Sequence, residues 1–174
     1  MAAIAWSDID ALPDVLANDR FQFLMAPSVN ADLNSTLALR CQQVSVPEEM
    51  FEPMVVALQG FEFSFRGRHV FDKLISATFI ETVDGAVSTG ISQWMQSIGG
   101  TESGNGGTKK TYSTTATLNV FDQSGNTALA FTIKNLWPSQ VPTTQLDGSQ
   151  TSPYIKQIQF TYDKFLPPNG GSES

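Results

Sequence analysis

Residues 74–98, with the sequence LISATFIETVDGAVSTGISQWMQSI, contain the change of hydrophobic period that decides the fold. In the first part of this stretch, apolar side chains recur at every second position, as in a strand with one buried face. The positions that share this face of a strand predicted over 74–83 are Ile75, Ala77, Phe79 and Val83. The stretch therefore begins as half-buried β-structure.

The second part of the stretch has an apolar spacing of three or four residues, which predicts a helix over 84–98. Asp84 is placed to cap the first turn, and Gly99 with Gly100 ends the helix. The side chains expected to anchor this helix in the core are Val87, Ile91, Trp94 and Ile98, with Met95 beside them.

Further segments of period two surround this strand and helix, so the chain is mainly β. They lie at 21–25, 61–66, 111–122, 127–134 and 154–165, and another extended run covers 37–46. After Gly60, the side chains of Phe61, Phe63 and Phe65 share one face, which we expect to be buried. Residues 122–126 have the composition of a hairpin connection, and residues 136–142 that of a proline-rich crossover.

These elements predict several strands and one substantial helix in a mainly β chain. The length of 174 residues fits one domain, 1–174. Ser7 to Asn18 has the apolar spacing of a short helix, so 1–19 is expected to form an N-terminal arm. Residues 166–174 are expected to be a flexible tail.

The charge balance opposes binding to nucleic acid. The chain has 17 Asp and Glu against 10 Lys and Arg, a net charge of −7, whereas contact with phosphate backbones depends on Lys and Arg. No apolar run approaches the ~20 residues that span a bilayer, so no membrane is expected as a partner. The composition favours a protein made in the cytoplasm.

The sequence predicts no catalytic, cofactor-binding or metal-binding residue, and therefore no enzyme. His69 is the one histidine, and it has no nucleophile motif beside it. Cys41 lies within the extended run 37–46, where a free cysteine is usually a small buried apolar group. One Cys and one His are too few for a zinc site of the usual type.

Residues 47–59 contain two prolines and three acids together with large apolar side chains. This composition fits neither a helix nor a central strand. We expect a long loop with an exposed apolar patch, which usually marks an interaction surface. The alternative is that its apolar side chains fold back onto the core of the same chain. The residues predicted to make contact are Glu48, Glu49, Met50, Phe51, Met54 and Val55.

Five short segments, in this order and spacing, give the chain a resemblance to a known family. They are Asn18-Asp19-Arg20-Phe21, Val44-Ser45-Val46-Pro47, Gly60-Phe61-Glu62-Phe63, Leu136-Trp137-Pro138-Ser139 and Ile158-Gln159-Phe160-Thr161-Tyr162-Asp163. The chain resembles the tail tube proteins of contractile phages, whose fold is shared with type VI secretion tubes. The resemblance covers nearly the whole chain.

The resemblance implies a structural virion protein located in the phage tail and made in the host cytoplasm. The implied subunit fold is a β-sandwich or small barrel of antiparallel strands with one packed α-helix. Six copies would close into a hexameric ring with a continuous inner β-barrel, and rings would stack into the conduit for DNA ejection. The loop 47–59 would then be the contact between rings. Implied partners are further copies of the chain, the tail sheath protein, and the baseplate and tail terminator proteins, while genomic DNA passes through the lumen without specific binding.

Two alternatives remain open from the sequence. A tube-like baseplate or tail-completion protein, or a type VI secretion tube subunit, would share the fold and differ in what passes through it. A carbohydrate-binding β-sandwich module is the alternative from another class, because Trp137 before Pro138 could stack on a sugar ring.

Overall fold

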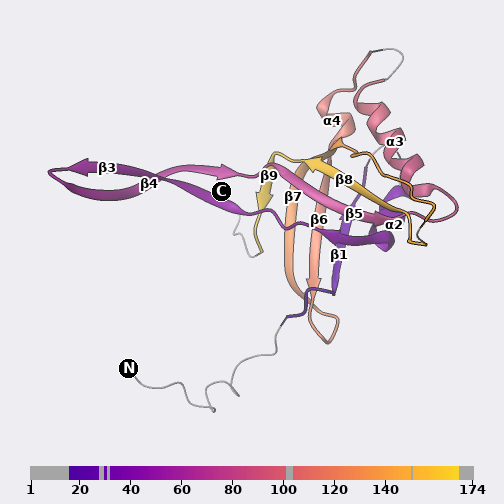
Figure 1. Ribbon diagram of the computed structural model, residues 1–174, viewed down its shortest axis with the longest axis horizontal. Coiled ribbons are helices and arrows are strands. Elements are labelled where there is room, and N and C mark those ends of the chain that lie inside the picture. Colours follow the sequence, from indigo (N-terminus) through magenta and orange to yellow (C-terminus); the bar gives the residue numbers. More distant parts are fainter. Residues whose placement is uncertain (1–15, 28–29, 31, 101–103, 150, 169–174) are drawn as a thin grey trace.

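A computed structural model describes residues 16–27, 30, 32–100, 104–149 and 151–168. The helix predicted within 7–18 and most of the tail predicted at 166–174 lie outside these residues. The described chain is mainly β and antiparallel with a helix packed against it, which confirms the predicted fold class (Figure 1).

The body of the molecule is a seven-stranded sheet in the order β1-β6-β7-β8-β5-β2, with β9 paired to β7. Every pairing in this sheet is antiparallel. The strands are β1 (Phe21–Met25), β2 (Cys41–Val44), β5 (Leu74–Ile80), β6 (Thr114–Phe121), β7 (Thr127–Gln140), β8 (Ile155–Thr161) and β9 (Lys164–Leu166). Among the described strands, β1, β2 and β9 each have a partner strand on one side only.

Strand β7 joins the two halves of the sheet because it changes partner along its length. Its first part pairs with β6 and β9, and Trp137 to Gln140 pair with β8. The change follows Asn135, whose backbone has a φ of 56°. The crossover predicted at 136–142 is therefore wrong for 136–140, which belong to β7. Pro138 lies opposite Phe160 next to a shift of register, where the strand does not need a backbone N–H donor.

The core lies between the two halves of this sheet and the helices. Phe160 of β8 is at its centre, with ring centroids 6.3 Å from Phe23, 6.5 Å from Phe79 and 6.0 Å from Trp94. These four rings come from β1, β5, β8 and a helix, so one aromatic cluster ties the layers together.

Helix α3 (Ala86–Ile98) covers this cluster. Among its predicted anchors, Val87, Ile91 and Trp94 are buried and Ile98 is half-buried. Two carboxylates satisfy N–H groups of the first turn. That of Glu81 accepts hydrogen bonds from Val87 and Ser88 at 3.1 and 2.7 Å, and that of the predicted cap Asp84 accepts one from Ala86 at 3.3 Å. Val83, expected to be buried, is fully exposed in the turn before α3.

Helix α2 (Asp32–Arg40) corrects the extended run predicted over 37–46. Leu33 and Leu37 of this helix are buried one turn apart, and β2 begins only at Cys41. Leu37 therefore belongs to a helical period that begins earlier, at Leu33, and alternation alone misses it. A further short helix, α4 (Lys109–Tyr112), precedes β6 in place of the first residues of the predicted strand 111–122.

Truncation of Trp94 is expected to remove the largest side chain of the core. Trp94 is fully buried, and its indole Nε1 donates a hydrogen bond to the carbonyl oxygen of Tyr112 at 2.6 Å. Trp94→Ala should lower the free energy of unfolding by ~3–5 kcal/mol, as large aromatic truncations in cores do. Chemical denaturation of a soluble monomeric form measures this, and a loss under about 1 kcal/mol would contradict the packing described.

Asp84 should make stability depend on pH in the acidic range. Its hydrogen bonds from the Arg40 guanidinium, with the shortest at 2.9 Å, and from Thr82 lower its pKa to about 2. The unfolded carboxyl titrates near 3.9, so this stabilisation is complete above that pH and is lost as the pH falls through about 2.

We expect Asp84→Asn to flatten the dependence of unfolding free energy on pH between about 4 and about 2. Denaturation at a series of pH values measures the slope. Asp72→Asn is a control that also removes one carboxylate, in the turn between β4 and β5. A slope that is the same in Asp84→Asn and in the parent protein would contradict the role of the Arg40–Asp84 pair.

Candidate assembly surface

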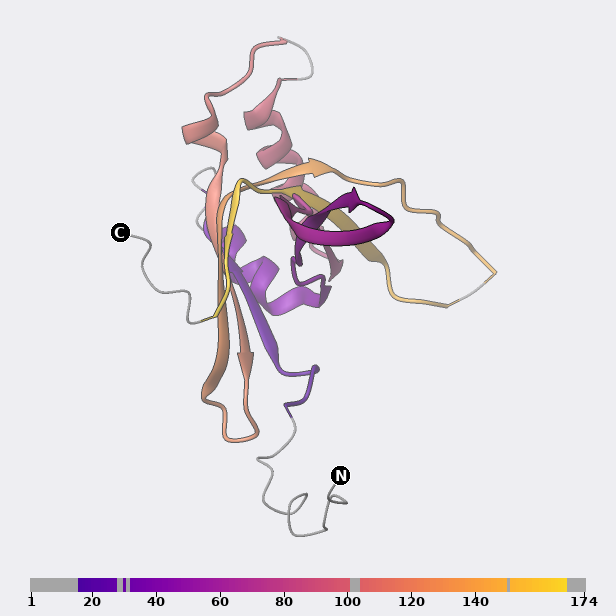
Figure 2. The ribbon, with the colours of Figure 1, turned by 90° about the vertical axis from the view of Figure 1, so that its left-hand side faces the viewer.

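Strands β3 (Glu49–Leu58) and β4 (Phe61–Phe71) form a two-stranded hairpin that projects away from the body (Figures 1 and 2). At its tip, Gln59 and Gly60 have φ values of 50° and 85°, as in the primed two-residue turns that match strand twist. We call β3, β4 and this turn the arm. The loop predicted at 47–59 is therefore wrong, because most of it is strand β3.

One face of the outer arm is entirely apolar. The register places Met54 opposite Phe65, Val56 opposite Phe63 and Leu58 opposite Phe61, and directly opposed side chains lie on the same face of a ribbon. We call these six residues the apolar face. All of them except Val56 are exposed, from 49% for Phe63 to 70% for Phe61.

The exposure of Phe61, Phe63 and Phe65 corrects the expectation that they are buried. Their alternation does identify one apolar face, but no other part of the described chain covers it. An exposed apolar surface of this kind on a protein usually marks a contact with another chain.

The predicted contact residues lie on the arm or directly before it, but they do not share one face. Glu48 is exposed before β3, and β3 begins at Glu49. By strand alternation, Met50 and Met54 lie on one side, and Phe51 and Val55 on the other. Phe51 stacks on His69 with ring centroids 4.3 Å apart, and the Arg66 guanidinium lies 4.8 Å from the Phe51 ring.

The apolar face also contains five residues that are not among the predicted contact residues, namely Val56, Leu58, Phe61, Phe63 and Phe65. A signal for them was present in the sequence. Alternating apolar residues on both sides of Gln59-Gly60 are typical of a hairpin, in which the two sets of apolar side chains meet on one face.

A β-bulge divides the arm into an inner and an outer part. The register shifts between Phe51 and Pro53, where β4 contains one more residue than β3. Gly67 lies in this bulge, and a Cβ atom there would be 2.1 Å from the carbonyl oxygen of Glu52. The bulge therefore requires glycine at this position, because any side chain would collide with the opposite backbone.

The residues weighed as candidates for catalysis are placed as follows. Burial raises the pKa of the Cys41 thiol to about 11, so the thiolate that a nucleophile needs is not formed at neutral pH. His69 is packed between the rings of Phe51 and Phe71. Among the described residues, no three His, Cys, Asp or Glu side chains gather as a metal site would require.

The tryptophans considered for sugar stacking are not exposed platforms in the described chain. Trp94 is buried, and Trp137 is half-buried in β7 with its ring 5.7 Å from that of Tyr112, edge to face. This packing disfavours the carbohydrate-binding alternative. None of the described helices is both long enough and apolar enough to cross a bilayer.

Substitution of Gly67 should loosen the arm and leave the body intact. In Gly67→Ala, the new Cβ would force the Glu52 backbone away, and amide hydrogen exchange in β3 and β4 should become about tenfold faster or more. Gly148→Ala is the matched control, since a Cβ atom there meets no other atom within 4 Å. Unchanged exchange in the arm of Gly67→Ala would show that the bulge adapts to a side chain.

Solved structures with a similar fold are components of contractile injection systems. The chain is similar to one from the sheath–tube complex of an extracellular contractile injection system, PVC, with 12% identity and a TM-score of 0.65, covering 95% of this chain and 98% of that chain. It is also similar to a chain from the tube-terminating cap of the anti-feeding prophage, with 11% identity and a TM-score of 0.67, covering 90% and 93% of the two chains.

A third similar structure is from the baseplate of the anti-feeding prophage, with 10% identity and a TM-score of 0.65, covering 92% of this chain and 99% of that chain. At such identities these likenesses show the fold alone. No curated protein sequence matches the chain significantly. The family model of the phage tail tube protein matches residues 11–167, nearly the whole length, and the chain therefore belongs to the phage tail tube protein family.

Proposed function

We propose that the protein is the subunit of the inner tail tube of a contractile-tailed phage and that it works by self-assembly. The family and the mainly β fold support a structural tube subunit. The observation that carries the proposal is the apolar face of the arm, which a single copy leaves in water.

Closure of six copies into a ring is the first step of the proposed assembly. In the described chain, β1, β2 and β9 each have one side without a partner strand, so the sheet has open edges. Open edges invite pairing with other chains, and a closed ring removes them by joining each edge to a neighbour. The inner strands of six copies would then form one continuous barrel around the lumen.

Stacking of rings is the second step, and we assign it to the arm. The arm extends outside the body, so its apolar face is free to lie against another ring (Figure 1; in Figure 2 the arm points toward the viewer). Contact there would bury Phe61, Phe63 and Phe65, each of which contributes ~1.5–3 kcal/mol when fully buried. The predicted contact residues Met50 and Met54 belong to the same side of β3.

The remaining partners follow from the position of such a tube in a tail. Similar chains come from complexes described as sheath–tube, tube-terminating cap and baseplate, which supports contacts with sheath, terminator and baseplate proteins. DNA would pass through the lumen without specific binding. The net charge of −7 supports this, because a like charge keeps the phosphate backbone from adhering to the wall.

Polar substitution of the apolar face tests the proposal. In Met54→Ser/Phe63→Ser/Phe65→Ser, the body retains its core because these side chains are exposed. We expect single rings at most and a loss of tubes in negative-stain electron microscopy and sedimentation, whereas the unaltered protein forms tubes when a baseplate nucleates them. Circular dichroism verifies that the variant is folded.

The matched control is Val55→Ser/Ser64→Ala, a directly opposed pair on the other face of the same arm. This control should still form tubes. Normal tube growth by the triple variant would overturn the assignment of stacking to the apolar face. Rings that never stack in the unaltered protein would instead indicate a tube-like baseplate or tail-completion protein, and a permanent monomer would remove the tube proposal.

A further inference from the structure

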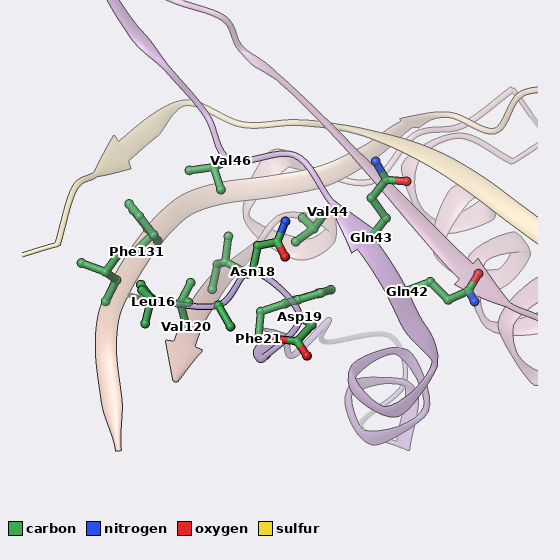
Figure 3. A pocket seen from close by; sticks show the side chains of 13 residues that line it. Leu16, Asn18, Asp19, Phe21, Gln42, Gln43, Val44, Val46, Val120 and Phe131 are labelled. Atoms are coloured by element: carbon green, nitrogen blue, oxygen red, sulfur yellow. The ribbon is translucent and has the colours of Figure 1, made fainter. Parts of the chain in front are cut away.

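A groove of about 680 Å³ lies in the body between β2 and the strands β1, β6 and β7 (Figure 3). One wall is formed by β1, β6 and β7, and the other by β2 and the residue Val46 beyond it. The groove is mostly apolar, and Asp19 is the one charged residue among those that line it.

The groove continues the hydrophobic core past the point where other elements cover it. Phe21 has the same parity as the buried Phe23 of β1, and Val120 the same parity as the buried Leu118 of β6. In β7, Leu129 and Phe131 likewise precede the buried Ile133 on one face.

The outer members of these sets, Phe21, Val120, Leu129 and Phe131, are only half-buried. The inner face of the sheet is therefore longer than the layer that covers it in the described chain. Removing apolar surface from water at the end of a core stabilises the folded state by about 25 cal/mol per Å². A further segment of apolar residues would complete this end of the core.

We infer that residues 1–15, which precede the described part of the chain, occupy this groove in the same subunit. The first described residue, Leu16, already lines the groove together with Ala17 to Asp19, and Figure 3 shows Leu16 beside Phe131 and Val120. The preceding residues are therefore attached at the groove itself.

The sequence of this segment matches the chemistry of the groove. Ile9 and Leu12 are three residues apart, so in a helix they share one side, whereas Asp10 and Asp14 fall on the opposite side. A segment with this pattern presents apolar side chains to the groove and carboxylates to water.

The same subunit is favoured over a second copy as the source of the segment. A covalently attached segment has an effective concentration near millimolar, far above that of another copy in dilute solution. Occupation from within the chain also leaves the apolar face of the arm as the surface available for other copies. The N-terminal segment is thus a part of the core and not a free tether.

Disulfide trapping in the full chain tests this inference. In a Cys41→Ser background, Leu12→Cys with Leu129→Cys should oxidise to an intramolecular disulfide about tenfold faster than Asp14→Cys with Leu129→Cys. Asp14 is nearer the attachment point but on the opposite side of the segment, so a freely moving tether would favour the control. Equal rates, a faster control, or disulfide-linked dimers in place of the intramolecular product would overturn the inference.

A second measurement leaves the groove unaltered. Leu12→Asp should uncover the groove and raise the fluorescence of anilinonaphthalene sulfonate about twofold, because this dye binds exposed apolar surface. Ala11→Asp adds the same charge next to it, away from the apolar side, and should leave the dye signal at the parent value. The same signal from both variants would also overturn the inference.

Discussion

The bend of β7 at Asn135 is the constraint on which the rest of the body depends. Asn135 has a positive φ, and its side-chain amide donates a hydrogen bond to the carboxylate of Asp163 at 2.7 Å. The same carboxylate is paired with the ammonium of Lys109, whose hydrogen bond lowers the pKa of Asp163. One side chain thus connects the bend to α4 and to the turn between β8 and β9. Because the pairs are exposed, their contribution is chiefly geometric, in fixing where β7 leaves β6 and joins β8.

This bend determines what the chain can bury by itself and what it cannot. Strand β7 serves both halves of the sheet, so the aromatic cluster around Phe160 is enclosed within one copy. The arm lies outside this enclosed body and is joined to it by the residues on either side of the hairpin, Pro47 and Asp72. A ribbon of two strands has no core of its own and is stable only when another surface covers it. The body is therefore the self-sufficient part of the subunit, and the arm is the part that requires a partner.

The sequence predicted the body better than the arm, for a physical reason. In β5, apolar alternation coincides with burial in the same chain, so the burial of Ile75, Ala77 and Phe79 was predicted correctly. In β4 the same alternation at Phe61, Phe63 and Phe65 describes a face that the described chain leaves exposed, and periodicity carries no information about which molecule covers a face. Contacts of the arm with other copies remain a prediction for the same reason.

Prolines account for two other differences between the predicted and the observed fold. Pro53 and Pro138 were taken as signs of irregular chain, yet each lies in a strand next to a shift of register. A bulge leaves a backbone position without a ladder hydrogen bond, so the missing N–H of proline costs little there. The helix α2 was missed because its apolar pattern is short, with Leu33 and Leu37 as its buried residues.

The bulge at Gly67 divides the arm into two parts in which the side chains of β4 alternate with opposite parity. Side chains alternate between faces along a strand, so inserting one residue would turn every later side chain to the other face. The extra residue of β4 makes such a change once, between the stacked rings of Phe51 and His69 at the base and the apolar face further out. Lengthening the outer arm by two residues in each strand would keep every side chain on its present face, whereas a change of one residue would exchange the apolar face for the polar one. The reach of the arm can thus evolve only in steps of two residues per strand, roughly 7 Å each.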